Sequence, residues 1–420
     1  MGKLLFNIYK SISYIGILFA FVFSFFSKTR SFTKKSFKKR LSPDLPRFKE
    51  KTILFHCASL GELNSAKEMI ETLKKKFPRN PVIITTFTET AIESAKKITE
   101  NSFLIPFDIQ KSVKKFLNDA NPGMVFISET EIWPIFISES AKKCKVYYIN
   151  ARMSEKTFKF YRFISPLIKH TFKNIERFFV QDKKSYDLLL NFVEEKKLLL
   201  CGNTKYDNLK ETTLEFSFEK EINKLDLKNK KIITFGSVHP DEAEKIIKSL
   251  ILLKKQIKEI RYVLVPRHIE KTKEFEDIIR KFEIKYAVLS KISEDPFKDL
   301  YDTELLLVDK LGVLLYFYSI SDLAFVGGTL NRVGGHNLLE PSVFAKPVLF
   351  GPNYLSQKES AEKLLENGGG FLVSDEYDLK ARISVILSDD KKLKEIGEKS
   401  NQTLKSLQGA TQKIIKEIWK

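Results

Sequence analysis

The chain of 420 residues has a mass of 48.7 kDa, which is too large for one compact core and suits two or three domains. Its 43% hydrophobic and 30% charged residues exclude disordered and collagen-like chains. The formal net charge is +19, but the first 51 residues hold twelve Lys and Arg against two acids and so carry +10 of it. The other residues carry +9, which is less positive charge than a dedicated nucleic-acid-binding protein has.

The N-terminal segment is predicted to attach the chain to a membrane. Residues 4–27 carry one charge, Lys10, and as a helix would measure about 36 Å, enough to cross a hydrocarbon core of about 30 Å. Seven cations follow between Lys28 and Arg40, which orients the next residues toward the cytoplasm and suits contact with membrane phospholipids. We expect residues 1–42 to form a membrane anchor and basic collar. A cleaved signal peptide and a helix lying in the interface stay open as alternatives.

Beyond Pro46, short β-rich runs alternate with segments of helical period, which is typical of βα units around parallel sheets. Strands are expected at 52–57, 81–86, 124–128, 145–150, 177–181 and near 198–201, and then at 231–236, 261–266, 285–290, 304–309, 322–328 and 346–351. The pattern predicts two doubly wound, Rossmann-like α/β domains. Their bounds are 43–210 and 231–400, with 211–230 as a linker and 401–420 as a C-terminal helix that could pack back on the first domain.

In open α/β sheets ligands bind beyond the carboxyl ends of the strands, so candidate residues are sought there. Glu62 follows the first strand at the start of a helix, where partial burial would raise its pKa and suit it to general-base work. The alternative is that this carboxylate only satisfies free N–H groups at the helix start.

The third expected strand runs into Glu129 and Glu131, with Trp133 and a proline after them. In extended geometry the two glutamates share a face, which indicates proton handling or a metal site. Alternatively, at least one glutamate lies beside a helix N-cap and the tryptophan belongs to the core. The chain has no DxD motif and no CxxC pair, which disfavours a metal, and no cofactor is expected.

Cations follow two further strands of the first series. Arg152 comes after the fourth strand and Lys205 after the run ending near residue 201. Either could pair with an anionic sugar or a phosphate, although a solvent-exposed cation would look the same in the sequence.

In the second domain, Ser237 and His239 lie between a strand and a helix, where N–H groups and the helix dipole favour a phosphate. A capping serine beside an uninvolved histidine is the alternative. Pro266 and Arg267 follow the next strand, and the arginine could meet a phosphate or a base edge.

A glycine-rich stretch is the most informative segment of the second domain. The pairs 327–328 and 334–335, which include Gly328 and Gly335, would let the backbone approach a phosphate closely. A helix is expected to open near residue 336, so that Asn337 and Glu340 would be neighbours able to address one ligand, such as ribose hydroxyls.

Eight segments in one order carry a resemblance to a known family: HCASLGE, SETEIWP, INARMS, GNTKYD, GSVHPDE, VPRH, FVGGTLNRVGGHNLLEP and LFGPNYLSQKESAEKL. Together they resemble the 3-deoxy-D-manno-octulosonic acid (Kdo) transferases of lipopolysaccharide assembly, over essentially the whole chain. The resemblance implies a GT-B glycosyltransferase at the inner membrane, with two domains facing a cleft. It implies inverting transfer of Kdo from CMP-Kdo to a phosphorylated lipid A precursor, lipid IVA.

The resemblance also implies roles for individual residues. The family's base matches Glu62, the acid that assists at the transition state matches Glu129, and its lysine matches Lys205. Donor-nucleotide contacts match Pro266, Arg267, Leu311, Gly312, Val313, Asn337, Leu338, Leu339 and Glu340. The chain departs from the family pattern where Val313 replaces a glutamate and where Asp241 replaces a glycine.

Two other function classes stay open on the sequence alone. One is a GT-B enzyme with a different nucleotide sugar, and the other is a non-enzymatic membrane-attached protein that binds anionic ligands. Nucleotide preference and the effect of replacing Glu62 by Gln would separate these three possibilities.

Overall fold

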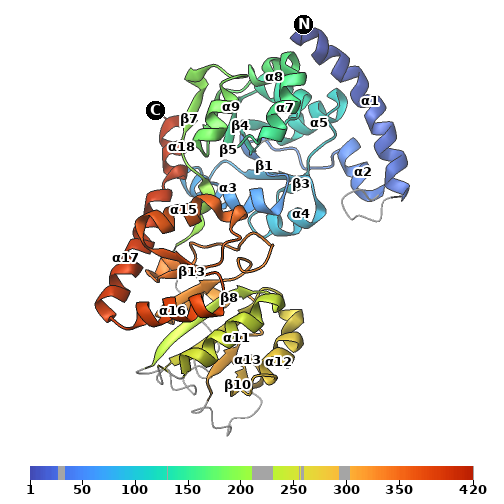
Figure 1. Cartoon of the computed structure of the whole chain (residues 1–420). Coiled ribbons are helices and arrows are strands. Elements are labelled where there is room, and N and C mark those ends of the chain that lie inside the picture. The colour runs from blue at the N-terminus through green and yellow to red at the C-terminus, as the bar shows by residue number, and fades with distance from the viewer. Residues whose placement is uncertain are drawn as a thin grey trace. The chain divides into compact units, whose positions relative to one another are not determined.

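The computed structural model describes residues 1–26, 34–129, 131–210, 230–254, 256, 260–292 and 303–419. The chain divides into two compact units (Figure 1). The N-terminal unit contains Met1–Asn208 and Leu407–Lys420, and the C-terminal unit contains Leu209–Ser406. The predicted linker at 211–230 lies outside the described residues apart from Lys230.

The sheet of the N-terminal unit has, in the described part of the chain, seven parallel strands in the order β3-β2-β1-β4-β5-β6-β7. The strands are β1 (Thr52–His56), β2 (Val82–Thr86), β3 (Ser102–Leu104), β4 (Pro122–Ser128), β5 (Lys145–Ala151), β6 (Arg177–Val180) and β7 (Leu198–Leu200). Chain order reverses between β1 and β4, which makes their carboxyl ends the switch point where doubly wound sheets bind ligands.

Alternate residues along the central strands fill two hydrophobic layers, because successive side chains of a strand point to opposite faces. Leu54 belongs to the layer with α5, α6 and α8, whereas Phe55 belongs to the layer with α3 and α18. The helices are α3 (Leu60–Lys76), α4 (Glu89–Lys96), α5 (Gln110–Ala120), α6 (Pro134–Ala141), α7 (Glu155–Phe163), α8 (Ser165–Phe172), α9 (Lys183–Leu189) and α18 (Ala410–Ile418). Through α18, the C-terminus of the chain contributes Ile414 and Ile415 to the N-terminal unit.

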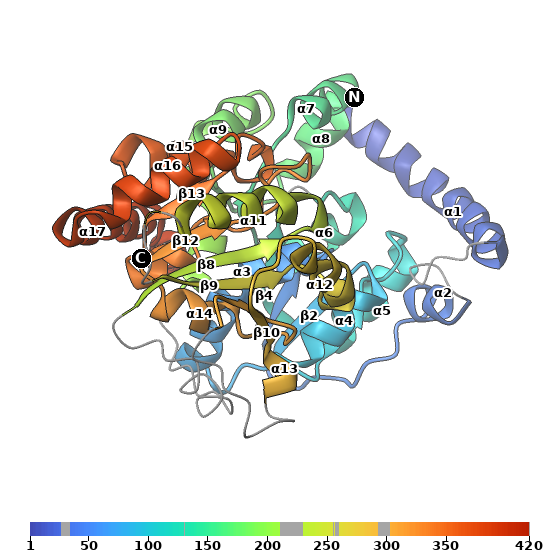
Figure 2. The ribbon, with the colours of Figure 1, turned by 60° about the horizontal axis from the view of Figure 1, so that its bottom comes forward.

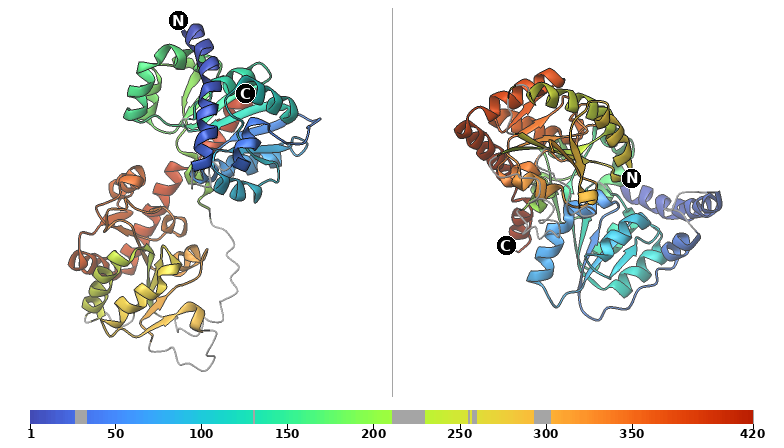
Figure 3. Two further views of the ribbon diagram at one scale, coloured as in Figure 1. Left: turned by 90° about the vertical axis from the view of Figure 1, so that its right-hand side faces the viewer. Right: turned by 90° about the horizontal axis from the view of Figure 1, so that it is seen from below.

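Two further helices, α1 (Gly2–Phe26) and α2 (Lys34–Leu41), lie at the periphery of this unit, and α8 lies beside the first turns of α1 (Figures 2 and 3). Phe6 is 5% exposed and joins the core, whereas Leu4, Ile8 and Ile12 are exposed. The predicted anchor falls on α1 except for residue 27, which is outside the described residues. Over the part of the chain that the structure describes, we find no helix both long enough and apolar enough to cross a membrane.

One residue of the predicted basic collar differs from expectation. Arg40 is 1% exposed, and its guanidinium donates hydrogen bonds to the carbonyl oxygens of Ile105 and Phe87. Burial lowers the pKa of Arg40 to about 10. This arginine is therefore part of the folded unit and is not available to lipid headgroups, whereas Lys38 and Lys39 are exposed.

The C-terminal unit holds a second parallel sheet, whose strands among the described residues run in the order β10-β11-β9-β8-β12-β13-β14. They are β8 (Lys231–Val238), β9 (Ile260–Pro266), β10 (Tyr286–Val288), β11 (Leu305–Leu307), β12 (Leu323–Val326), β13 (Val348–Phe350) and β14 (Gly370–Leu372). The helices are α11 (Pro240–Lys254), α12 (Thr272–Arg280), α13 (Leu289–Ile292), α14 (Leu314–Ile320), α15 (Lys358–Asn367), α16 (Glu376–Leu387) and α17 (Asp390–Leu407). Its switch point lies between β8 and β12.

Candidate active site

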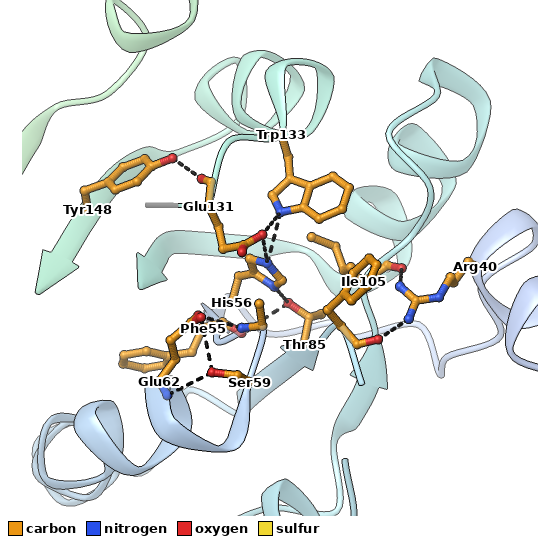
Figure 4. A network of polar contacts seen from close by, with 12 residues as sticks. Arg40, Phe55, His56, Ser59, Glu62, Thr85, Ile105, Glu131, Trp133 and Tyr148 are labelled. Carbon is orange, nitrogen blue, oxygen red and sulfur yellow. Dashed lines mark hydrogen bonds and ion pairs between the residues drawn. The ribbon is translucent and has the colours of Figure 1, made fainter. Parts of the chain in front are cut away.

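Glu62 lies at the switch point of the first sheet, in the turn between β1 and α3. Ser59 is the N-cap of α3, and Glu62 Oε2 accepts a hydrogen bond of 2.7 Å from the Ala58 N–H. The Glu62 N–H donates a hydrogen bond of 3.3 Å to the Ser59 hydroxyl oxygen, which caps α3, and the Ser59 hydroxyl donates one of 3.3 Å to Glu62 Oε1 (Figure 4). The cap of α3 is thus Ser59, and the Glu62 carboxylate accepts from an N–H that precedes the helix and not from a free N–H of its first turn.

The same carboxyl group has the electrostatics of a general base. Burial raises the pKa of Glu62 to about 8. The hydrogen bond from the Ala58 N–H lowers this pKa and offsets part of the effect of burial, whereas the charges of Glu129 and Glu131 raise it further. A carboxyl that titrates near the working pH is suited to taking a proton in a transition state. Capping and proton transfer are compatible, since the cap fixes the orientation of the group.

Glu129 follows β4, the strand on the other side of the switch point. Its φ of 55° ends the extended strand, so the expectation that Glu129 and Glu131 share one face of a strand is wrong. Burial raises the pKa of Glu129, and the positive charges of Arg152 and Lys205 act against this rise. These two cations therefore lie close enough to Glu129 to stabilise its ionised form.

Glu131 belongs to a hydrogen-bonded network with Trp133 and His56 (Figure 4). The Trp133 indole N–H donates to Glu131 Oε2 at 3.0 Å and lies 3.1 Å from His56 Nε2. His56 Nε2 also lies 3.9 Å from Glu131 Oε2, and His56 Nδ1 lies 3.1 Å from the Thr85 hydroxyl oxygen. Burial acts to raise the pKa of Glu131, but His56 and the indole hold it below its ordinary value.

The N-terminal site therefore combines two carboxyl groups of raised pKa, one of lowered pKa, and two cations. When the surroundings push the pKa values of carboxyl groups apart, one group can be protonated while another is ionised at the same pH. Within the described ranges, no three His, Cys, Asp or Glu residues are grouped so that they could hold a metal ion.

Glu242 organises the switch point of the second sheet. Its buried carboxylate accepts hydrogen bonds from the N–H groups of Gly328, Thr329 and Leu330 at 2.7 to 3.0 Å, and from His239 at 3.1 Å. These amides, expected to be available to a phosphate, are already occupied. Gly328 can contribute only a close approach of its backbone, and α11 begins at Pro240, which has no N–H.

The glycines of this loop are required by geometry. A Cβ at Gly327 would lie 2.5 Å from the Ser237 carbonyl oxygen, and Gly328 and Gly335 have φ values of 74° and 93°. Ser237 itself has a φ of 55° at the end of β8 and lies two residues before His239, which precedes α11, so the serine is not the helix cap considered from the sequence.

Three histidines surround this loop. His239 Nε2 lies 2.8 Å from His336 Nε2 with the rings parallel, and His268 meets His239 edge to face at 5.8 Å between ring centroids. Burial lowers the pKa of His336 to about 4, and the charge of nearby Arg267 contributes. A neutral histidine pair beside an exposed arginine offers both hydrogen bonds and positive charge to a ligand.

Asn337 and Glu340 are neighbours, as predicted, but not in a helix. Only a short 3-10 turn, Pro341–Phe344, follows them, and Asn337 Nδ2 lies 3.4 Å from Glu340 Oε1. Burial raises the pKa of Glu340 to about 7.

Most of the other residues predicted to contact the donor nucleotide have side chains that are buried. Leu338 and Leu339 are fully buried, and Pro266 and Val313 are also buried, so their side chains cannot reach a ligand. Leu311 is 74% exposed and Gly312 has a φ of 80°, in the turn between β11 and α14.

Comparison with known proteins identifies the family. A family model described as 3-deoxy-D-manno-octulosonic-acid transferase (kdotransferase) matches residues 32–208. A 3-deoxy-D-manno-octulosonic acid transferase of Chlamydia pneumoniae is 31% identical over 346 residues, which cover 80% of this chain and 77% of that protein. The chain belongs to the Kdo transferase family.

The resemblance drawn from the motifs is thus confirmed, and as a Kdo transferase family member the chain is a glycosyltransferase. A bifunctional glycosyltransferase/methyltransferase of Fusobacterium nucleatum is 30% identical over 383 residues, which cover 87% of this chain but only 58% of that protein. A solved glycosyltransferase structure from Rickettsia africae covers 88% of this chain and 98% of its own, with a TM-score of 0.57 and 18% identity, and shows the likeness of fold.

In this Kdo transferase family member, four residues were not assigned to the sites from the sequence. His56 lies inside a strand and His268 and His336 adjoin assigned residues, but imidazoles give no periodic signal of their own. Glu242 looked like an ordinary first-turn acid of α11. The signal that could have revealed its role is the spacing of three residues from His239, whose N–H donates to the Glu242 carboxylate.

Proposed function

We propose that the chain transfers Kdo from CMP-Kdo, with inversion, to a phosphorylated lipid A precursor such as lipid IVA. The observation that carries this proposal is Glu62, a buried carboxyl group with a raised pKa at the switch point of the first sheet. A sugar hydroxyl is a poor nucleophile at neutral pH, and a base poised near that pH can remove its proton during attack.

Each step of the transfer has a candidate residue. Glu62 takes the hydroxyl proton of the acceptor while its oxygen attacks the anomeric carbon of Kdo, and the bond to CMP breaks on the opposite face. A single displacement inverts that carbon. Lys205 and Arg152, which act electrostatically on Glu129, are suited to the carboxylate of Kdo or a phosphate of the acceptor.

The nucleotide is proposed to bind the C-terminal unit. Arg267 is exposed beside the histidines of the glycine-rich loop and can pair with the phosphate of CMP, and Asn337 and Glu340 can address ribose hydroxyls. Because Glu242 occupies the loop amides, positive charge for the phosphate comes from side chains in this proposal.

We further propose that the chain works at the cytoplasmic side of the inner membrane, attached through residues 1–42. The exposed aliphatic side chains of α1 and the exposed Lys38 and Lys39 support contact with phospholipids.

The proposal is tested by incubating the full chain with lipid IVA and a panel of sugar donors, then measuring the mass of the glycolipid. We expect the glycolipid to gain the mass of Kdo only when CMP-Kdo is the donor. Transfer from a uridine or adenosine diphosphate sugar instead would show that the donor has been misassigned, and absence of any transfer would contradict the proposal.

A further inference from the structure

A polar contact of Tyr9 joins helix α1 to the core of the N-terminal unit. The Tyr9 hydroxyl donates a hydrogen bond of 2.8 Å to Asp108 Oδ2. One turn earlier, Phe6 packs into the core with its ring 5.1 Å from that of His170. A helix that served only as a tether would need neither contact.

Asp108 connects this contact to α6. Its Oδ2 accepts a hydrogen bond of 3.0 Å from the Ile135 N–H, and its Oδ1 accepts one of 2.7 Å from the Phe136 N–H. These are first-turn amides of α6, which have no partner within the helix. The N-cap residue, Trp133, supplies no side-chain cap, so Asp108 caps α6 from a distant part of the sequence.

The capped end of α6 adjoins the hydrogen-bonded network of Glu131, Trp133 and His56. Trp133 immediately precedes the helix, and its indole N–H holds Glu131 and meets His56. The Glu131 carbonyl oxygen is held in turn by the Tyr148 hydroxyl (Figure 4). The charge of Glu131 acts on Glu62, so the position of the start of α6 bears on the proposed base.

We propose that α1 is a positioning element of the active site, with Tyr9 and Asp108 as the positioning residues that fix Trp133 and Glu131. This inference rests on the proposed function for its kinetic consequence. The coupling runs from the hydrogen bonds of Asp108 through the backbone at the start of α6 to the hydrogen bonds of Trp133, all within one compact unit. Loss of the Tyr9 hydroxyl removes one of the hydrogen-bond donors to the buried carboxylate of Asp108.

The test compares Tyr9→Phe with Tyr14→Phe in the full chain. Both remove one hydroxyl from α1, but Tyr14 is 51% exposed and serves as the matched control. Both variants carry Trp419→Phe, because the chain has two tryptophans and this change leaves Trp133 as the sole tryptophan, which is excited selectively at the red edge of the absorption band. Activity is measured with CMP-Kdo and acceptor dispersed in detergent, so that membrane attachment has no influence.

We expect Tyr9→Phe to shift the emission maximum of Trp133 and to lower kcat about three- to tenfold with little change in the KM for CMP-Kdo, and Tyr14→Phe to do neither. Asp108→Asn, which retains one accepting oxygen, should shift the emission in the same direction. Emission or kcat of Tyr9→Phe equal to that of Tyr14→Phe would overturn the proposal. If the parent chain transferred no Kdo, the proposed function would fail, while the emission of Trp133 would still decide whether α1 positions the site.

Discussion

Opposing influences set the ionisation of Glu62. Burial and the neighbouring Glu129 and Glu131 disfavour its charge, while the Ala58 N–H and the Ser59 hydroxyl stabilise it. The result is a pKa of about 8, which the chain achieves with residues that also cap α3.

The pH dependence of transfer follows from this balance. A general base must be ionised, so we expect kcat/KM to rise with pH and to level off above an apparent pKa of about 8. Removing the charge of Glu129 lowers the pKa of Glu62, so the residual activity of Glu129→Gln should show the same rise at lower pH. Kinetic profiles of both proteins check this; a rise centred below pH 6 in the parent chain would contradict it.

Glu242 is the second residue whose environment predicts a measurable effect. The side-chain NH2 of a glutamine there would face loop amides that now donate to a carboxylate. We therefore expect Glu242→Gln to destabilise the C-terminal unit by about 2 kcal/mol. We also expect it to weaken CMP binding about tenfold. Calorimetry with and without CMP measures both quantities. Glu244→Gln, an exposed change in the same helix, is the control. Equal behaviour of the two variants would refute a role for Glu242.

At the scale of elements, the alternation of strands and helices was predictable because buried parallel strands read as apolar runs. β3 and β14 were missed because only two of the three residues in each, SFL and GFL, are apolar, which is too short a run to predict a strand. The expected helix near residue 336 failed because the backbone at Gly334 and Gly335 takes positive φ and the chain resumes only in a short turn.

The candidate sites were predictable in position but not in detail. Strand ends located Glu62, Glu129 and Arg267, since ligands of open α/β sheets bind beyond the carboxyl ends of the strands. The occupation of the loop amides by Glu242 and the burial of Arg40 depend on tertiary contacts that no local pattern encodes.

Helix α1 presents one face to the core and another to the exterior, and we expect the exposed face to bind membranes. Replacing both Ile8 and Ile12 by lysine places charge on the exposed face, and we expect at least about tenfold weaker binding to vesicles that contain phosphatidylglycerol. Activity in detergent should be retained. The matched control, Tyr377→Lys with Val385→Lys, adds the same charges to exposed positions of α16. Vesicle binding that is equal in the two double variants would contradict attachment through α1.

At the scale of the whole molecule, each unit has its own core and its own switch-point site, so a ligand of one unit can be distinguished from a ligand of the other. Both tryptophans, Trp133 and Trp419, belong to the N-terminal unit. Unfolding followed by tryptophan fluorescence therefore reports on that unit alone.

We expect CMP to protect the C-terminal unit selectively. At a concentration of 100 Kd a bound ligand stabilises its unit by about 2.7 kcal/mol. The calorimetric transition of the C-terminal unit should move to higher temperature, while the fluorescence transition stays in place. If CMP raised the temperature of the fluorescence transition alone, the nucleotide would bind the N-terminal unit and the prediction would be wrong.

The central claim is that Glu62 takes the proton of the acceptor hydroxyl, and the rate of Kdo transfer by Glu62→Gln tests it most directly. Glutamine preserves the size of the side chain and one accepting oxygen for the Ala58 N–H, so the fold should be kept. We predict a rate of glycolipid formation lower by about a hundredfold or more. Glu71→Gln, a change at a half-exposed position of the same helix, should retain the parent rate. Transfer by Glu62→Gln at the rate of the parent chain would contradict the account.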